Sequence, residues 1–160
     1  MSVGYFTTAL RRRRCLIPAD GFYEWTGSDQ TKQPYWIHLQ ERTPSCWREP
    51  PVFAFAGIWE RWQGPEGSVV ETCAILNTTA NPLMQVLHER MPVILPPETY
   101  DDWLDPNVQD PQQVVPLLCP FPPEAMVAYP VSTHVNSPRH QDPVCREPVG
   151  DPVTVLSLPS

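Results

Sequence analysis

Glu24 is the first residue of the sequence whose type and setting could support proton transfer. It lies in the aromatic run Phe22-Tyr23-Glu24-Trp25, directly after a tight turn at PADG. Alternation along a strand places Phe22 and Glu24 on one face and Tyr23 and Trp25 on the other. Partial burial beside apolar surface raises the pKa of a carboxyl group and suits it to general acid/base catalysis near neutral pH. The alternative is an exposed glutamate on the wet face of an edge strand, and spacing alone favours that alternative.

His88 is the second candidate for proton transfer. The segment Pro82 to His88 (PLMQVLH) predicts a short helix, and we expect Asn77-Thr78-Thr79 to form a cap or turn before it. Met91 precedes a proline and is therefore biased towards extended structure, so His88 falls where a helix gives way to a loop. A histidine, with an ordinary pKa of roughly 6.5, is suited to shuttle protons at such a place. The alternative is a histidine satisfied by nearby backbone.

Short strands and short helices must position these residues, because 22 of the 160 residues are proline. Proline interrupts both helices and the hydrogen-bond ladders of β-sheets. An apolar content of 41% in 160 residues is typical of one domain with a real core. Apolar patterning and turn residues predict strands over 15–17, 22–25, 34–40, 52–59, 69–77, 93–95 and 126–131, and helical segments over 5–14, 96–104 and 112–118. A turn is expected over 60–68, and the chain beyond Val149 is expected to be loosely held.

Five cysteines without a CxxC pair make a zinc site or a complete disulfide framework unexpected and favour a reducing cytoplasm. Cys15 and Cys73 lie in apolar runs and are predicted to be small core residues. Cys46 and Cys145 lie in polar, proline-rich loops, where we expect them to be incidental. No metal and no cofactor is predicted.

The net charge of −7 is unevenly distributed. Residues 1–92 hold nine basic and nine acidic side chains, and the entire acidic excess lies in residues 93–160. The basic run Arg11 to Arg14 closes the first predicted helix, where arginines complement the helix dipole. A phosphate-binding role for some of the four is the alternative, and a local basic surface of this kind is compatible with nucleic acid. No apolar stretch approaches the length needed to span a bilayer.

Five blocks of the sequence, taken in order, are characteristic of one family. They are RRCLIPADGFYEW, FAFAGIWERW, ETCAILNTTAN, LHERMPVIL and YPVSTHVNSP. Together they resemble the SOS response-associated peptidase (SRAP) family, whose members crosslink abasic sites in single-stranded DNA, over roughly Leu10 to Val149. The resemblance implies an α+β fold, mainly antiparallel β, with a barrel-like core and a few short peripheral helices. Residues 1–149 would form the SRAP domain and residues 150–160 a proline-containing tail.

The resemblance also implies a chemistry. In the family, an amino-terminal cysteine attacks the aldehyde of the abasic sugar and closes a thiazolidine ring. Glu24 and His88 match the family's two acid/base residues, Arg90 matches an arginine that grips DNA phosphate, and Asn77 and Thr78 would line the DNA channel. The implied protein is a bacterial, cytoplasmic and monomeric enzyme of the DNA damage (SOS) response, nucleoid-associated when it acts, with peptidase or lyase-type chemistry and single-stranded DNA as partner.

The sequence also departs from the family pattern. It begins Met-Ser-Val-Gly, where family members begin Met-Cys-Gly-Arg, and it lacks a family Asn-Ala-Arg segment. An upstream start, a fragment and a decayed paralogue are three explanations. In each case we expect the chain as written to form no thiazolidine crosslink. Two alternative functions follow. One is non-covalent binding of single-stranded DNA; the other is a thiol autopeptidase, although no cysteine has a spacing that supports pairing with His88.

Overall fold

The computed structural model describes residues 3–27, 32–40 and 51–157; for residues 3–6 it describes the backbone alone. The chain divides into two compact units, each built from three stretches. The first comprises the described residues within Met1–Pro18, Phe53–Thr78 and Pro92–Pro120. The second comprises those within Ala19–Val52, Thr79–Met91 and Phe121–Ser160.

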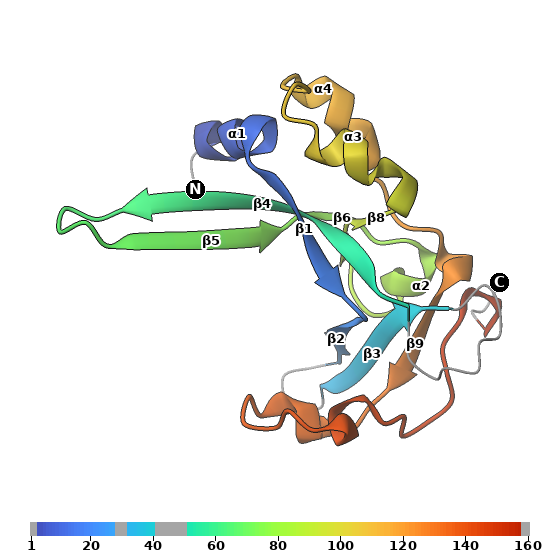
Figure 1. Ribbon diagram of the computed structural model, residues 1–160. Coiled ribbons are helices and arrows are strands. Elements are labelled where there is room, and N and C mark those ends of the chain that lie inside the picture. Colours follow the sequence, from blue (N-terminus) through green and yellow to red (C-terminus); the bar gives the residue numbers. More distant parts are fainter. Residues whose placement is uncertain (1–2, 28–31, 41–50, 158–160) are drawn as a thin grey trace. The chain divides into compact units, whose positions relative to one another are not determined.

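The first unit is organised on a sheet with the strand order β1-β4-β5 (Figure 1). The strands are β1 (Arg14–Ala19), β4 (Phe53–Gln63) and β5 (Val69–Ile75), and the short β8 (Ile94–Leu95) also pairs with β4. β4 is longer than the predicted strand, because its register with β5 continues to the pair Gln63↔Val69. The predicted start of the turn at residue 60 is therefore wrong, because the strand continues to Gln63. The apolar first half of β4 is buried, and its polar second half is an exposed two-stranded extension.

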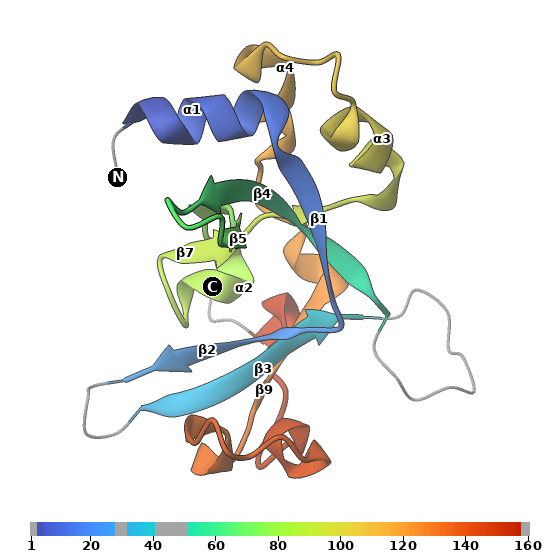
Figure 2. The ribbon, with the colours of Figure 1, turned by 60° about the vertical axis from the view of Figure 1, so that its left-hand side comes forward.

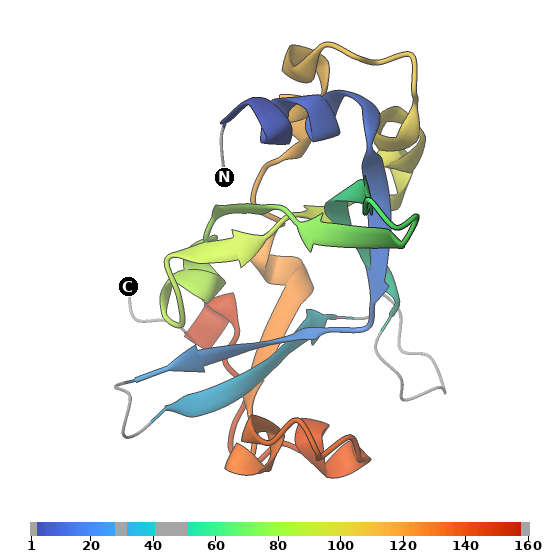
Figure 3. The same cartoon turned by 90° about the vertical axis from the view of Figure 1, so that its left-hand side faces the viewer.

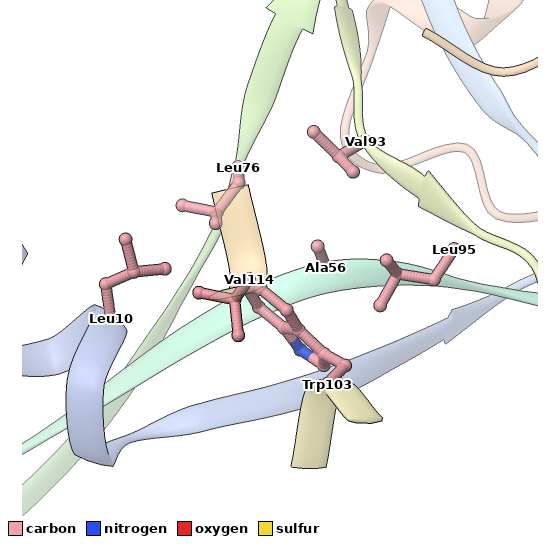
Figure 4. Close-up of a cluster of buried hydrophobic side chains, with 7 residues drawn as sticks. All are labelled: Leu10, Ala56, Leu76, Val93, Leu95, Trp103 and Val114. Carbon is pink, nitrogen blue, oxygen red and sulfur yellow. The ribbon is translucent and has the colours of Figure 1, made fainter. Parts of the chain in front are cut away.

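The helices of the first unit are α1 (Val3–Arg12), η1 (Pro97–Thr99), α3 (Tyr100–Leu104), α4 (Pro111–Val114) and η2 (Val115–Leu117). Three of them, α1, α3 and α4, bury apolar side chains in a core with β4. Figure 4 shows the resulting core, in which Leu10, Trp103 and Val114 come from three helices and surround Ala56 of β4. Trp103 is fully buried, and its indole Nε1 donates to the carbonyl of Cys15 over 3.0 Å. Burial of such a large ring is a dominant favourable contribution to this unit.

The arginine run takes three different structural roles. Arg14 is only 9% exposed and donates to the carbonyls of Leu10, Arg11, Trp103 and Asp105. Burial lowers the pKa of its guanidinium, and the Asp105 carboxylate opposes this shift. Arg13 pairs with Glu60 over 2.6 Å, whereas Arg11 and Arg12 are exposed. Neither the solvated nor the phosphate-binding interpretation describes Arg14, which holds α1 to the end of α3.

The second unit contains an antiparallel sheet with the strand order β2-β3-β9. The strands are β2 (Phe22–Thr26), β3 (Gln33–Leu39) and β9 (Met126–Pro130). β9 lies at the end of this order, as Pro130 predicts. Beyond β9, Val153 and Ala128 exchange backbone hydrogen bonds of 2.8 and 3.0 Å, so the chain after Val149 remains attached to the sheet at this point.

One face of this sheet is covered by η4 (Thr133–Asn136) and η5 (Pro143–Arg146). Tyr23 and Trp25 lie on this face: the Tyr23 hydroxyl donates to the Cys145 carbonyl over 3.2 Å, and Trp25 Nε1 donates to Asn136 Oδ1 over 2.8 Å. The Tyr23 ring also packs on Trp36, with centroids 4.8 Å apart. Burial, and then the Cys145 thiol, raise the pKa of Tyr23, so its hydroxyl remains a neutral donor.

The opposite side of the sheet carries α2 (Pro82–Gln85) and the start of β7 (Arg90–Pro92). Figures 2 and 3 show α2 on one side of β2 and β3, and the η4 and η5 segment on the other. β7 pairs with β6 (Asn77–Thr79) in a two-stranded sheet. The remaining helical turns are η3 (Pro123–Ala125) and η6 (Val155–Ser157).

The expectation that Cys73 is a core residue is wrong. Cys73 is exposed, because it lies on the outer part of β5, whereas Cys145 is buried with 6% of its surface accessible. Cys15 is half-buried, and burial together with the nearby Cys73 thiol raises its pKa. Cys46 lies outside the described residues.

The α+β class with mainly antiparallel strands is confirmed. Among the helices that the structure describes, none combines the length and the apolar character needed to cross a membrane.

Candidate functional site

Glu24 occupies the middle of β2 and lies opposite Tyr35 of β3. It is half-buried, and its Oε1 accepts a hydrogen bond of 3.1 Å from the Trp25 backbone N–H. The turn that introduces β2 requires glycine at position 21. A Cβ added to Gly21 would stand 2.3 Å from the Trp36 ring and 2.7 Å from the Ile37 carbonyl. Close approach of the turn to β3 therefore fixes where β2 begins and where Glu24 falls along it.

Glu24 points to the α2 side of the sheet. The neighbouring residues Tyr23 and Trp25 contact η4 and η5 on one face, and strand alternation places Glu24 on the other. Ile37 lies on the same face as Glu24 and is fully buried. A carboxylate beside apolar side chains on the face that α2 covers agrees with the predicted setting.

His88 follows α2, and a buried asparagine fixes this helix. Asn81 is only 4% exposed; its Oδ1 accepts from the Met84 backbone N–H over 2.9 Å, and its Nδ2 donates to the Phe121 carbonyl over 2.7 Å. The Met84 carbonyl then accepts from the backbone N–H of His88 over 2.8 Å. Asn81 is a helix N-cap that also attaches α2 to the segment before β9, and it thereby positions His88.

The His88 ring is exposed and held by the backbone of Arg90. Its Nδ1 lies 3.0 Å from the Arg90 backbone nitrogen and 3.1 Å from the Arg90 carbonyl oxygen. The N–H donates to Nδ1 when the ring is neutral, and the carbonyl accepts from Nδ1 when the ring is protonated. Nδ1 is thus satisfied in both charge states, and Nε2 remains for a substrate. This arrangement suits a proton shuttle, and the backbone contact expected in the alternative interpretation is also present.

Arg90 begins β7 and is exposed. It lies two residues from His88. The segment from Ala80 to Glu89, which contains α2 and His88, is closed by a hydrogen bond of 3.1 Å from the Ala80 N–H to the Glu89 carbonyl. A guanidinium at this place is suited to bind phosphate through charge-assisted hydrogen bonds.

The structure divides the predicted site residues between the two units. Glu24, His88 and Arg90 belong to the second unit, and Asn77 and Thr78 to the first. Asn77 is exposed, whereas the half-buried Thr78 donates its hydroxyl to the Leu118 carbonyl over 3.0 Å. The Thr78 hydroxyl proton therefore serves the protein backbone in this structure.

The cap that positions α2 and His88 is Asn81, which the sequence did not predict, since the expected cap was Asn77-Thr78-Thr79. That stretch forms β6 instead. The available signal was the pair Asn81-Pro82, which places an N-cap residue directly before a proline at the first helical position.

The chain belongs to the SOS response associated peptidase (SRAP) family, whose model matches residues 1–138. The chain is 44% identical over 139 residues to the abasic site processing protein YoqW of Bacillus subtilis, covering 86% of this chain and 58% of that protein. It is 34% identical over 152 residues to the abasic site processing protein HMCES of Gallus gallus, covering 88% and 45%.

Solved structures support the fold. A protein from Bacteroides thetaiotaomicron superimposes with a TM-score of 0.76 at 30% identity, covering 88% of this chain and 59% of that one. A protein from Bordetella bronchiseptica gives a TM-score of 0.65 at 27% identity over 79% of this chain and 59% of that one. The chain spans 58% and 45% of the lengths of the two curated relatives named above.

Proposed function

We propose that this chain processes abasic sites in single-stranded DNA, with Glu24 and His88 as acid/base residues and Arg90 as a phosphate ligand. The curated relatives that match most of the chain are named abasic site processing proteins. The observation that supports the assignment of roles is that Glu24 and His88 belong to one unit, in which Glu24 faces away from η4 and η5 and His88 directly follows α2, the helix on the other side of the sheet.

The chemistry of an abasic site needs proton transfers of the kind these residues supply. The sugar is mostly a closed hemiacetal, and opening it moves a proton from the C1 hydroxyl to the ring oxygen. A carboxylate removes the first proton and returns it to the ring oxygen, which is general acid/base catalysis. In the family, an amino-terminal cysteine supplies the amine that condenses with the free aldehyde and the thiol that closes the thiazolidine. For the chain as written, which begins Met-Ser, the proposal covers opening of the sugar, and His88 is proposed to assist Glu24 in the proton transfers of that step.

The proposal is tested with a labelled single-stranded oligonucleotide that carries one abasic site, next to an intact oligonucleotide of the same sequence. Native gels measure binding by the purified protein, capture of the free aldehyde by a hydroxylamine probe measures the rate of sugar opening, and denaturing gels measure strand cleavage. We expect Glu24→Gln and His88→Gln to slow processing by about 100-fold and to leave binding within about twofold. Glu71→Gln, an exposed position on β5, is the matched control.

Arg90→Ala should weaken binding and reduce the slope of log affinity against log salt by about one. Equal binding of abasic and intact DNA, with no acceleration of sugar opening, no cleavage and no effect of Glu24→Gln, would refute the proposal and support a non-covalent single-stranded DNA-binding module. We further propose that the protein acts as a monomer, in the bacterial cytoplasm at the nucleoid. Size-exclusion chromatography tests the monomeric state.

A further inference from the structure

His134, Asp142 and Cys145 gather three metal-ligating groups on the face of the second unit's sheet opposite α2. His134 Nε2 lies 3.0 Å from Asp142 Oδ2, and the Cys145 Sγ lies with both within a span of 4.8 Å. The burial of these residues differs: Cys145 is buried, His134 intermediate and Asp142 exposed. We propose that these three side chains bind one Zn²⁺ ion.

Short-range contacts hold two of the ligands in place. Ser132 caps η4 by accepting from the His134 N–H over 3.2 Å, and Asp142 caps η5 through Oδ1, which accepts from the Val144 N–H over 3.1 Å. The cap uses one oxygen of Asp142 and leaves the other facing His134. The His134 ring is further fixed by His140, which stacks on it with centroids 3.6 Å apart and an interplanar angle of 6°. Pre-organisation of this kind is what tight metal sites require.

The donor set selects the type of metal. A thiolate and an imidazole disfavour Mg²⁺ and Ca²⁺, which take oxygen ligands, and the mixture of N, O and S suits Zn²⁺. Zinc bonds of about 2.0–2.3 Å place tetrahedral ligand atoms about 3.5 Å apart. The observed span of 4.8 Å therefore closes on an ion after a side-chain adjustment of about 1 Å. Binding releases the thiol proton to solvent, and the charges of Asp142 and Cys145 then balance the ion.

A cavity of about 360 Å³ adjoins the cluster and leaves room for a fourth ligand. Asp142 and Cys145 line it together with Tyr23, His140 and Arg146. Three protein ligands and a water molecule complete a tetrahedron. The ion would tie η4 to η5 beneath β2, where Tyr23 already bonds to the Cys145 carbonyl. The site is separate from Glu24, which lies on the opposite face of the sheet, and from His88, which follows α2 in the chain, and its test does not depend on the proposed function.

The test begins with protein freed of metal by a chelator and then titrated with Zn²⁺ in calorimetry. We expect one ion per chain and a rise in the thermal unfolding midpoint, because a ligand that binds only the folded state stabilises it. Co²⁺ should give the absorption of a tetrahedral thiolate complex. His134→Ala and Cys145→Ser should bind Zn²⁺ at least about tenfold more weakly, since changing only a supporting residue already costs about that much, and Cys145→Ser should abolish the thiolate band.

Two control variants separate this site from other thiols and carboxylates. Cys119→Ser and Asp151→Asn change exposed residues outside the cluster and should leave affinity and stoichiometry unchanged. Far-UV circular dichroism verifies that each variant is folded. Folded His134→Ala that binds Zn²⁺ as tightly as the parent protein would overturn the proposal. Loss of the thiolate band in Cys119→Ser, or no bound Zn²⁺ at all, would also overturn it.

Discussion

Replacing Arg14 with alanine should destabilise the first unit substantially. The guanidinium donates four hydrogen bonds to backbone carbonyls, including those of Leu10 and Asp105 at 2.8 and 2.6 Å, and it lies 5.6 Å from the Trp103 ring centroid. At a net value of about 1 kcal/mol per hydrogen bond the loss is about 4 kcal/mol. Removing the buried charge also removes the free-energy cost of its desolvation, which offsets part of this loss. We therefore expect the free energy of unfolding to fall by about 3 kcal/mol.

Urea unfolding followed by tryptophan fluorescence measures this loss. With a slope of about 2 kcal/mol per molar urea, the midpoint should fall by about 1.5 M. Arg12→Ala, at the exposed last position of α1, two residues before Arg14, is the control and should change stability by no more than about 0.5 kcal/mol. Arg14→Lys should fall between the two, because an ammonium keeps the charge but loses the planar fork. A loss of less than about 1 kcal/mol in Arg14→Ala would refute this account.

Three further predictions concern single positions. Gly21→Ala should lower the unfolding midpoint in urea, because the added Cβ would stand 2.3 Å from the Trp36 ring; a midpoint equal to that of the parent protein would contradict this. Asn81→Ala should cost about 1–3 kcal/mol of stability, since it removes the cap of α2 and leaves the Phe121 carbonyl without its donor, and the same urea titration measures the loss. Alkylation of Cys15 should require higher pH than an ordinary thiol, because burial and Cys73 raise its pKa; peptide mass spectrometry after labelling across a pH series follows each thiol, and rapid labelling of Cys15 at neutral pH would contradict the shift.

The sequence predicted strand positions well where one face is buried. Alternation in β2 placed Tyr23 and Trp25 together, and the structure confirms this through their contacts with η5 and η4. Pro130 correctly indicated an edge strand, since β9 lies at the end of the order β2-β3-β9. These features depend on a few neighbouring residues, which is why local patterns reveal them.

Features that depend on distant segments were not predictable. The burial of Cys145 depends on η5 folding back onto β2, and nothing in its polar, proline-rich surroundings indicates this contact. The role of Arg14 depends on carbonyls about 90 residues later in the chain, at Trp103 and Asp105. His134, Asp142 and Cys145 have no CxxC-type spacing, so the cluster becomes visible only after η4 and η5 fold together.

The interleaving of the two units has a consequence for how the protein can be made. The chain passes from one unit to the other after residues 18, 52, 78, 91 and 120. During synthesis, the first unit therefore lacks α4 until residues near 114 have left the ribosome, and the second lacks β9 until residues near 130 have done so. Early segments must wait for distant partners, a topology that favours slow folding. No single cut in the backbone yields two halves that each contain one whole unit.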